Sequence, residues 1–390
     1  MVWRSQQFWV PGDNTLAPGA QKGCSANGYH AILLVNCDRR TEIDVRTPRV
    51  LIAAVAVLMT AVGVTACTGD AAVDKNGVTT LRYQGWPGQV ILPEVAEHLG
   101  FFDGKITLDW VGNTISGPQD IQSAATGQTD FGGAFAGAVA KLITSGAPIT
   151  SVINYYGTDQ QTIAGFYVRD DSPITKPTDL VGKKIGVNTL GGQLEADIHD
   201  QLKKDGLSQE QIKTVQLVAL PAPNTEDALR KGQIDAAGLS GQFQQRAVIN
   251  GGLRAVFTDL SLYGPFNGGP YVFRNDLIKK NPEGVRAFTA GVAKAIEWER
   301  TTPREKVLAT FSDIVTKRKR PNDDTSSLKY WLSVGVPSKG GLLSDSDFTR
   351  WQSWLQDTGS IKGDLDASKF YTNEFNPYAD QGAKSDAKAG

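Results

Sequence analysis

The sequence predicts an α/β fold with mainly parallel sheets, arranged in two lobes and followed by a helical region. From Thr79 onward, short runs rich in β-branched and aromatic residues alternate with amphipathic helical patterns, as in strand–helix–strand units. After about Asn275 the patterns are helical alone. A helix end, a glycine, Gln-x-Asp and a small-residue strand occur at 124–130 and again at 228–235. This repeat indicates two similar lobes, although so short a motif can recur by chance.

The predicted strands are the short apolar runs between the helical patterns. They cover Thr79–Gln84, Ile106–Val111, Asp130–Gly132, Ile149–Ile153, Lys184–Val187, Val215–Leu220, Ala236–Leu239, Arg254–Phe257 and Pro270–Phe273. Pro118 opens one intervening helix and Gly127 closes it, which matches the preference for proline in the first turn and glycine past the end. Later helices are predicted at Val285–Arg300 and Arg304–Phe311, and Ser344 begins another as its cap.

The beginning of the chain predicts an export signal. Arg46 and Arg49 precede an apolar run that ends at Cys67 and is too short to span a bilayer comfortably. The ending Val64-Thr65-Ala66-Cys67 resembles a bacterial lipobox, whose cysteine carries lipid and becomes the mature N-terminus. The alternatives are a single membrane-spanning helix with an incidental cysteine, or a buried core helix.

This interpretation divides the N-terminal part into three segments. Residues 1–44 fit no signal-peptide plan and are interpreted as a non-native upstream extension, 45–66 as the signal peptide and 67–78 as a tether. Cys24 and Cys37 lie upstream of the proposed cleavage site, so the mature chain would keep only its lipidated cysteine. We therefore expect no disulfide framework.

Charge and histidine spacing favour neither a nucleic-acid partner nor metal chemistry. The formal net charge is −1, and Lys317-Arg318-Lys319-Arg320, directly before Pro321, is interpreted as a solvated helix end rather than a docking patch. His98 and His199 lie far apart on predicted helices, without the spacing of paired metal ligands or a nucleophile. We expect no metal, no cofactor and no catalytic residues.

Four segments, in their order and spacing, resemble the substrate-binding lipoproteins of ABC importers. The branch concerned includes nitrate, taurine and alkanesulfonate binders and the thiamine-pyrimidine-precursor group. The segments are Pro93–Phe102, Gly127–Gly132, Asp179–Val187 and Ala228–Ala237. The resemblance covers roughly residues 79–378. It implies a type II periplasmic-binding-protein fold, with two α/β lobes, two crossovers between them and a helical C-terminal extension.

The resemblance also implies where the domains lie. It places the first crossing near Gly165–Asp170 and the return near Pro265–Tyr271. The expected domains are the first lobe at 79–167 and 268–378, the second lobe at 168–267, and a tail at 379–390 whose polar, small residues predict disorder.

The implied function is that of a solute receptor. It captures a small, anionic organic ligand of the sulfonate, taurine or aromatic carboxylate type and delivers it to an ABC permease and ATPase. The receptor would be monomeric and extracytoplasmic, held at the outer face of the cell membrane by lipid on Cys67. The first alternative is a binder of a thiamine-precursor pyrimidine or related heterocycle. The second is an enzyme on the same fold, of the pyrimidine synthase or menaquinone-pathway type.

Candidate ligand contacts lie where strands lead into helix starts, since ligands of open α/β sheets bind beyond the carboxyl ends of the strands. In the first lobe they are Gln84, Trp86, Ser116, Gly133, Ala134, Phe135 and Tyr156. In the second lobe and the return crossing they are Thr189, Gly191, Gly192, Ser240, Gln242, Phe266 and Asn267.

Each candidate has a chemical reason and a structural alternative. Trp86 offers an apolar face to a ligand, and the Gly191–Gly192 turn lets the backbone approach an anion at a helix start. The alternatives are hinge packing for Trp86 and ordinary helix capping for Ser116. The aromatic residues Tyr156 and Phe266 suit an organic ligand with apolar surface better than a bare inorganic ion.

Overall fold

The computed structural model describes residues 71–321, 323 and 325–379. The predicted signal peptide, the proposed lipidation site Cys67 and nearly all of the predicted tail lie outside these residues. Ala72–Val73, within the segment predicted as a tether, forms the short strand β1 and pairs with the strand that follows it.

The first lobe contains two adjoining three-stranded sheets. One has the order β1-β2-β3, with β2 at Thr79–Gly85 and β3 at Ile106–Asn113; the other has the order β4-β11-β5, with β4 at Phe131–Gly133, β11 at Phe266–Arg274 and β5 at Ile149–Thr158. The Asp130 N–H donates to the Arg82 carbonyl over 2.9 Å, so β4 lies beside β2. Strands β2 and β3 are parallel, whereas β11 runs antiparallel to both of its neighbours.

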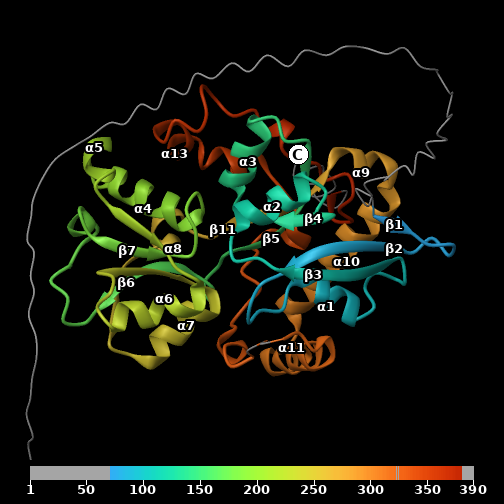
Figure 1. Cartoon of the computed structure of the whole chain (residues 1–390), viewed down its shortest axis with the longest axis horizontal. Helices are drawn as coiled ribbons and strands as arrows, with labels where there is room; N and C mark the ends of the chain where they lie inside the picture. Colours follow the sequence, from blue (N-terminus) through green and yellow to red (C-terminus); the bar gives the residue numbers. More distant parts are fainter. Residues whose placement is uncertain (1–70, 322, 324, 380–390) are drawn as a thin grey trace, which may run out of the picture. The chain divides into compact units, whose positions relative to one another are not determined.

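Helices cover both faces of these sheets. They are α1 (Leu92–His98), α2 (Gly117–Ala125), α3 (Ala136–Thr144), α9 (Asn275–Lys280), α10 (Pro282–Thr301), α11 (Arg304–Arg318), α12 (Asp345–Thr349) and α13 (Gln352–Asp357). Figure 1 shows α2 and α3 on one side of the β2-β3 pair and α1 and α11 on the other.

The second lobe is built on one five-stranded sheet with the order β10-β6-β9-β7-β8. The strands are β6 (Ala164–Arg169), β7 (Lys184–Val187), β8 (Gln216–Ala219), β9 (Ala236–Ser240) and β10 (Leu253–Thr258). The helices are α4 (Gln193–Lys204), α5 (Gln209–Ile212), α6 (Ala222–Arg230), α7 (Gly241–Asn250) and α8 (Asp259–Tyr263). Figure 1 shows α4 on one face of this sheet and α6 and α7 on the other.

The first crossing lies earlier than the sequence predicted. Residues 165–170, expected to carry the chain between the lobes, belong almost entirely to β6, which is hydrogen-bonded on both sides within the second lobe. The crossing is the short segment 159–163, and the return lies at Gly264–Pro265, between α8 and β11. The expectation of mainly parallel sheets is also too broad. Among the named strands of the described residues, the parallel pairings are those of β2 with β3 and of β7 with β8 and β9.

Apart from the pairing of β1 with β2, the antiparallel pairings involve β6 and β11, the strands that follow the two crossings. Parallel neighbours need a crossover connection such as a helix, and β2 and β3 are joined in this way through α1. Strands β5 and β6 are joined instead by the bare segment 159–163, so they enter separate sheets and pair there with strands of opposite direction.

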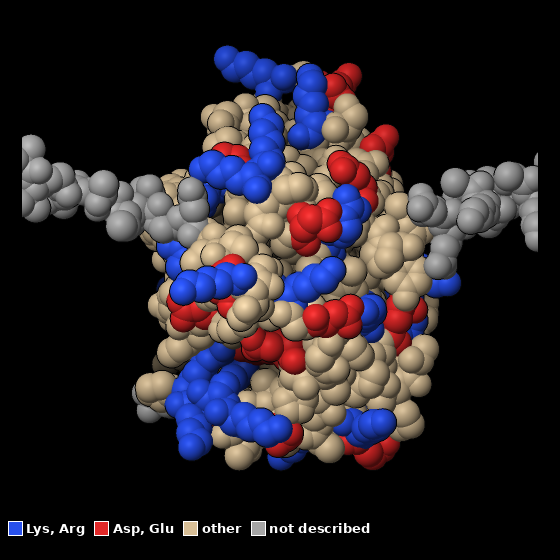
Figure 2. Space-filling model, turned by 90° about the vertical axis from the view of Figure 1, so that its right-hand side faces the viewer, with Lys and Arg blue, Asp and Glu red and all other residues tan. Residues whose placement is uncertain are grey.

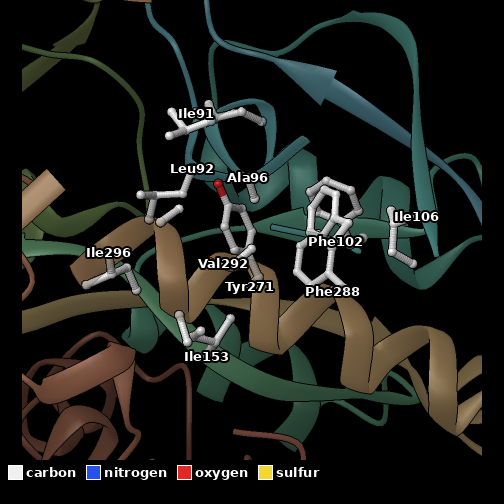
Figure 3. Packing of buried hydrophobic residues seen from close by; sticks show 14 of the residues in the cluster. Ile91, Leu92, Ala96, Phe102, Ile106, Ile153, Tyr271, Phe288, Val292 and Ile296 are labelled. Carbon is white, nitrogen blue, oxygen red and sulfur yellow. The ribbon is translucent and has the colours of Figure 1, made fainter. Parts of the chain in front are cut away.

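One core cluster fills the space between the first-lobe sheets and helices α1 and α10. Figure 3 shows Phe288, Val292 and Ile296 on α10 close to Tyr271 of β11, with Leu92 of α1 beside them. These residues are all buried. The α10 residues are spaced by four, so they lie along one face of the helix.

The basic run at the end of α11 is not a solvated helix end throughout. Arg318 Nη1 lies 2.7 Å from Glu94 Oε2, and Arg320 Nη2 lies 2.5 Å from Glu94 Oε1. The two arginine side chains are only 10% and 6% exposed. Lys317 is exposed, as predicted. The sequence prediction was wrong for the two arginines, since α11 packs against α1 and directs them at its buried glutamate.

The described surface carries mixed charge. Figure 2 shows Lys and Arg side chains interspersed with Asp and Glu over one face, in keeping with the net charge of −1. Within residues 71–379, apart from 322 and 324, no helix is long and apolar enough to cross a membrane. The same residues contain no group of three or more His, Cys, Asp or Glu side chains that could hold a metal ion.

Candidate ligand-binding cleft

A cavity of about 350 Å³ lies between the two lobes. This volume is at the small end of the ~300–1,000 Å³ typical of ligand sites and suits a small organic molecule. The first lobe contributes the loop from β2 to α1, the starts of α2 and α3, and the loop 331–334. The second lobe contributes the starts of α4, α6 and α7, and the crossing segment lies between.

Several helices begin at this cavity, which supplies it with backbone donors. The N-terminal N–H groups of a helix have no partner within the helix and carry partial positive charge. Phe135, Gly192, Pro221 and Ser240 precede α3, α4, α6 and α7, and all four line the cavity. These donors can bind acceptor atoms of a ligand, whether or not the ligand is charged.

Hydrogen bonds join the lobes around the cavity. Ser116 Oγ and Thr189 Oγ1 lie 2.9 Å apart. Ser116 occupies the N-cap position of α2, and Thr189 follows β7. On another side, Gln242 Nε2 donates to the Gly88 carbonyl and to Ser327 Oγ, each over 2.8 Å. The structure is therefore one in which the two walls touch.

Eight of the residues predicted from the sequence line the cavity. They are Trp86, Ala134, Phe135, Tyr156, Thr189, Gly192, Ser240 and Gln242. They come from both lobes, and the structure brings them together around one space.

The other six predicted residues lie outside the lining. Ser116 lies at the edge of the cavity, where its hydroxyl is hydrogen-bonded to that of Thr189. Gly191, two residues after Thr189, has a left-handed backbone conformation with φ 71°. A Cβ on Gly133 would lie 2.7 Å from the Tyr155 ring, so this glycine permits close packing behind the cavity. Gln84 lies on β2, next to Tyr83, and its Oε1 atom is buried without a hydrogen bond from the described residues.

Phe266 and Asn267 are the two predicted residues engaged most fully elsewhere. Phe266 packs against Trp351, with 5.8 Å between ring centroids. Asn267 Nδ2 donates to Asp347 Oδ1 over 3.1 Å, and its Oδ1 accepts from the Ser338 hydroxyl at 3.1 Å. In this structure both side chains hold the return strand β11 to the C-terminal helices rather than facing the cavity.

The sequence analysis did not select several residues that line the cavity. Tyr271, Phe311 and Trp331 add aromatic surface, and Tyr271 stacks with 4.1 Å between ring centroids on Tyr155, which the sequence had suggested together with Tyr156 as part of an aromatic wall. Glu299 on α10 also lines it. A sequence signal for Glu299 existed, because it follows Val292 and Ile296 at helical spacing and so interrupts an otherwise apolar stripe.

The charged groups at the cavity are acidic. None of the described residues in its lining is Lys, Arg or His, whereas Asp259 and Glu299 both belong to it. Burial raises the pKa of Asp259 to about 6, against hydrogen bonds from the Thr158 hydroxyl and the Ala164 N–H. Asp259 thereby connects β5, β6 and α8 at the two crossings.

Two further carboxyl groups differ in how they are stabilised. Asp120 accepts the Gly133 N–H over 2.7 Å, and burial raises its pKa to about 7. Burial alone raises the pKa of Glu299 to about 8. Within the described part of the chain, no hydrogen bond or ion pair reaches the Glu299 carboxyl.

Two α/β lobes joined by two crossings, with a cavity between them, define the periplasmic-binding-protein fold. The sequence from 94 to 306 matches the NMT1/THI5-like family, and the chain belongs to this family. A putative binding protein of Brucella abortus is 27% identical over 273 residues, which cover 67% of this chain and 79% of the relative.

Solved structures of similar fold include both binding proteins and an enzyme. The alkanesulfonate-binding protein SsuA of Xanthomonas axonopodis, bound to MOPS, matches with a TM-score of 0.58 at 19% identity, over 75% of this chain and 98% of its own. The nitrate-binding protein NrtA of Synechocystis matches with a TM-score of 0.58 at 13% identity, over 80% and 89%. The desulfurization enzyme DSZB matches with a TM-score of 0.51 at 19% identity, over 76% and 97%. At these identities the likeness establishes the fold and leaves function to the site.

Proposed function

We propose that the chain is an extracytoplasmic solute-binding lipoprotein of an ABC importer, which captures a small organic ligand between its lobes and delivers it to the permease and ATPase. The observation that carries the proposal is the cavity lined by both lobes, with Ser116 and Thr189 bonded across its edge. A ligand that contacts both walls favours the closed arrangement by its additional contacts there. Membership of the family and likeness to proteins named as binding proteins support this function.

The cavity lining favours a flat organic ligand, uncharged or positively charged, over the anion suggested by the sequence. Trp86, Phe135 and Tyr156 supply aromatic surface, and the charged side chains in the described lining are Asp259 and Glu299. A pyrimidine of the thiamine-precursor type or a related heterocycle is therefore the better-supported ligand class. A sulfonate, taurine or an aromatic carboxylate remains the second candidate, because helix starts at the cavity offer donors to an anion.

Ligand capture is testable by thermal shift and tryptophan fluorescence. In a panel of pyrimidines, aromatic amines, sulfonates and carboxylates, at least one compound should raise the melting temperature progressively with its concentration. A hundredfold excess over Kd corresponds to about 2.7 kcal/mol of stabilisation. Fluorescence should change on binding because Trp86 and Trp331 line the cavity. Trp86→Ala should weaken binding at least tenfold. Trp298→Ala, which alters a tryptophan outside the lining, is the control; equal losses would contradict the placement of the site.

The lipid anchor is testable separately from binding. Cys67→Ala should release the protein from the membrane fraction while leaving ligand affinity unchanged, because the proposed lipid holds the receptor near its permease and does not touch the cleft. Fractionation with mass spectrometry of the native N-terminus measures both points. A mature protein that stays membrane-bound without Cys67, or that begins upstream of Val45, would contradict the proposed anchor and processing.

An enzyme on the same fold is the competing class, since DSZB shares the architecture. The two classes differ in what happens to the ligand. A transport receptor returns its bound compound chemically unchanged after denaturation and extraction, whereas an enzyme yields product over repeated turnover. Mass spectrometry of compound incubated with the purified protein distinguishes them.

A further inference from the structure

Glu299 occupies a position that does not favour a carboxylate. It lies in the last turn of α10, one turn beyond Ile296, and is 6% exposed. The lining of the cavity to which it belongs also contains Leu92, Phe311 and Trp331. The C-terminal end of a helix carries partial negative charge, which adds to the cost of burying an acid there.

Within the described part of the chain, the absence of a partner distinguishes Glu299 from the other buried acids. Glu94, on α1, forms ion pairs with two arginines and accepts a hydrogen bond from the Tyr83 hydroxyl. Asp259 accepts from the Thr158 hydroxyl and from backbone N–H groups. For Glu299 the described residues supply neither a cation nor a hydrogen-bond donor, although its side chain lines the cavity. A buried carboxyl without a partner does not stabilise the fold, because burying an unsatisfied polar or charged group costs free energy.

The electrostatic surroundings at the cavity agree with this reading. The tyrosines that face it, Tyr156 and Tyr271, have raised pKa values, with burial as the first cause and nearby carboxylates as the next. For Tyr156 these are Asp197 and Asp259. The described lining has no cationic side chain, and any full charge on its two carboxyl groups, Asp259 and Glu299, is negative. The helix starts contribute donors, which suit acceptor atoms elsewhere on the same ligand.

We propose that Glu299 is the specificity-determining residue of the cleft, and that it binds a positively charged or hydrogen-donating nitrogen, such as an amine or amidine, on a small aromatic ligand. The assignment rests on the proposed solute capture. The aromatic side chains hold the ring of the ligand, and the carboxylate forms a charge-assisted hydrogen bond with its nitrogen. This bond gives the Glu299 carboxylate a partner, which the described residues do not supply.

Three probes that share one ring and differ in charge test the assignment: benzamidine, benzamide and benzenesulfonate. Binding is measured by calorimetry and thermal shift on the whole mature chain. The wild type should bind benzamidine at least tenfold more tightly than benzenesulfonate. The near-isosteric Glu299→Gln should lose at least tenfold in benzamidine affinity and much less for benzamide. Glu305→Gln, which removes an exposed carboxylate from α11, should behave as the wild type.

The outcomes distinguish a failure of the Glu299 assignment from a failure of the proposed solute capture. Tighter binding of benzenesulfonate than of benzamidine, or a benzamidine affinity that Glu299→Gln leaves unchanged, would overturn the role of Glu299 while solute capture stands. If no probe binds but a small-metabolite extract stabilises the protein, the assignment is likewise overturned. If the extract also fails, the proposed function falls and the assignment with it.

Discussion

Glu94→Ala should lower the free energy of unfolding by about 3–5 kcal/mol, because it leaves two buried guanidinium groups without their common anion. Arg318 and Arg320 both bond the Glu94 carboxylate, and the Tyr83 hydroxyl donates to it over 2.8 Å. Arg318 keeps Asp323 as a second partner at 2.6 Å. Arg320 is stacked over Trp110 at 4.8 Å and forms an ion pair with Glu94, so its isolation should account for much of the loss.

Urea unfolding of the purified chain measures this effect. Glu97→Ala on the same helix is the matched control, because Glu97 is exposed and accepts the Leu108 N–H over 2.7 Å. It should cost only about 1 kcal/mol. A Glu94→Ala variant that loses no more stability than Glu97→Ala would show that the buried cluster contributes little to the first lobe.

Glu299→Gln should make the empty protein more stable, by a few kcal/mol at pH 8, and should leave it unchanged at pH 4. The pKa of this glutamate rises from 4.5 to about 8 in the folded protein, with burial as the cause. The folded state therefore holds the proton more tightly than the unfolded chain does. The resulting stabilisation is complete below about pH 4.5 and is lost as pH rises through 8. Glutamine resembles the protonated side chain, so the variant avoids this loss.

Thermal unfolding of both proteins between pH 4 and pH 8.5 gives the comparison. Asp120 and Asp259 also have raised pKa values, and they contribute equally to both proteins, so their effects cancel in the difference. Tyr271, which packs beside α10, stays protonated throughout because its pKa is raised well above its usual value. A constant difference across this pH range would mean that Glu299 already has a partner, in conflict with its proposed role in binding.

Much of the fold could be predicted from the sequence because local signals and global architecture agree. Lys184–Val187, for example, was predicted with its observed bounds, since a buried parallel strand reads as a short apolar run. Strand β6 was missed, although its run Ala164–Arg169 is equally apolar. The crossing had been assigned by resemblance, and nothing local distinguishes a strand just after a crossing from the crossing itself.

The lining of the candidate cavity was predictable where it depends on backbone turns and not where it depends on tertiary contacts. Thr189, Gly192 and Ser240 follow strands and precede helices, and such loops converge in any sheet of this type. The spacing of Glu299 from Val292 and Ile296 places it on the apolar face of its helix, but nothing local shows that this end of the face reaches the cavity. Arg320 was misjudged for the same reason, because only the packing of α11 on α1 determines which basic residues are buried.

The interruption of the first lobe by the second has a consequence for how ligand range can change. Residues 164–263 form one continuous block between two short crossings, and this block supplies the helix starts on one side of the cleft. Recombination at the two crossings would exchange that wall as a unit. The opposite wall, with Trp86 before the block and Glu299 after it, is divided between distant parts of the gene. New backbone donors for the acceptor atoms of a ligand can thus be acquired in a single exchange, whereas ligand charge preference at Glu299 changes by point mutation.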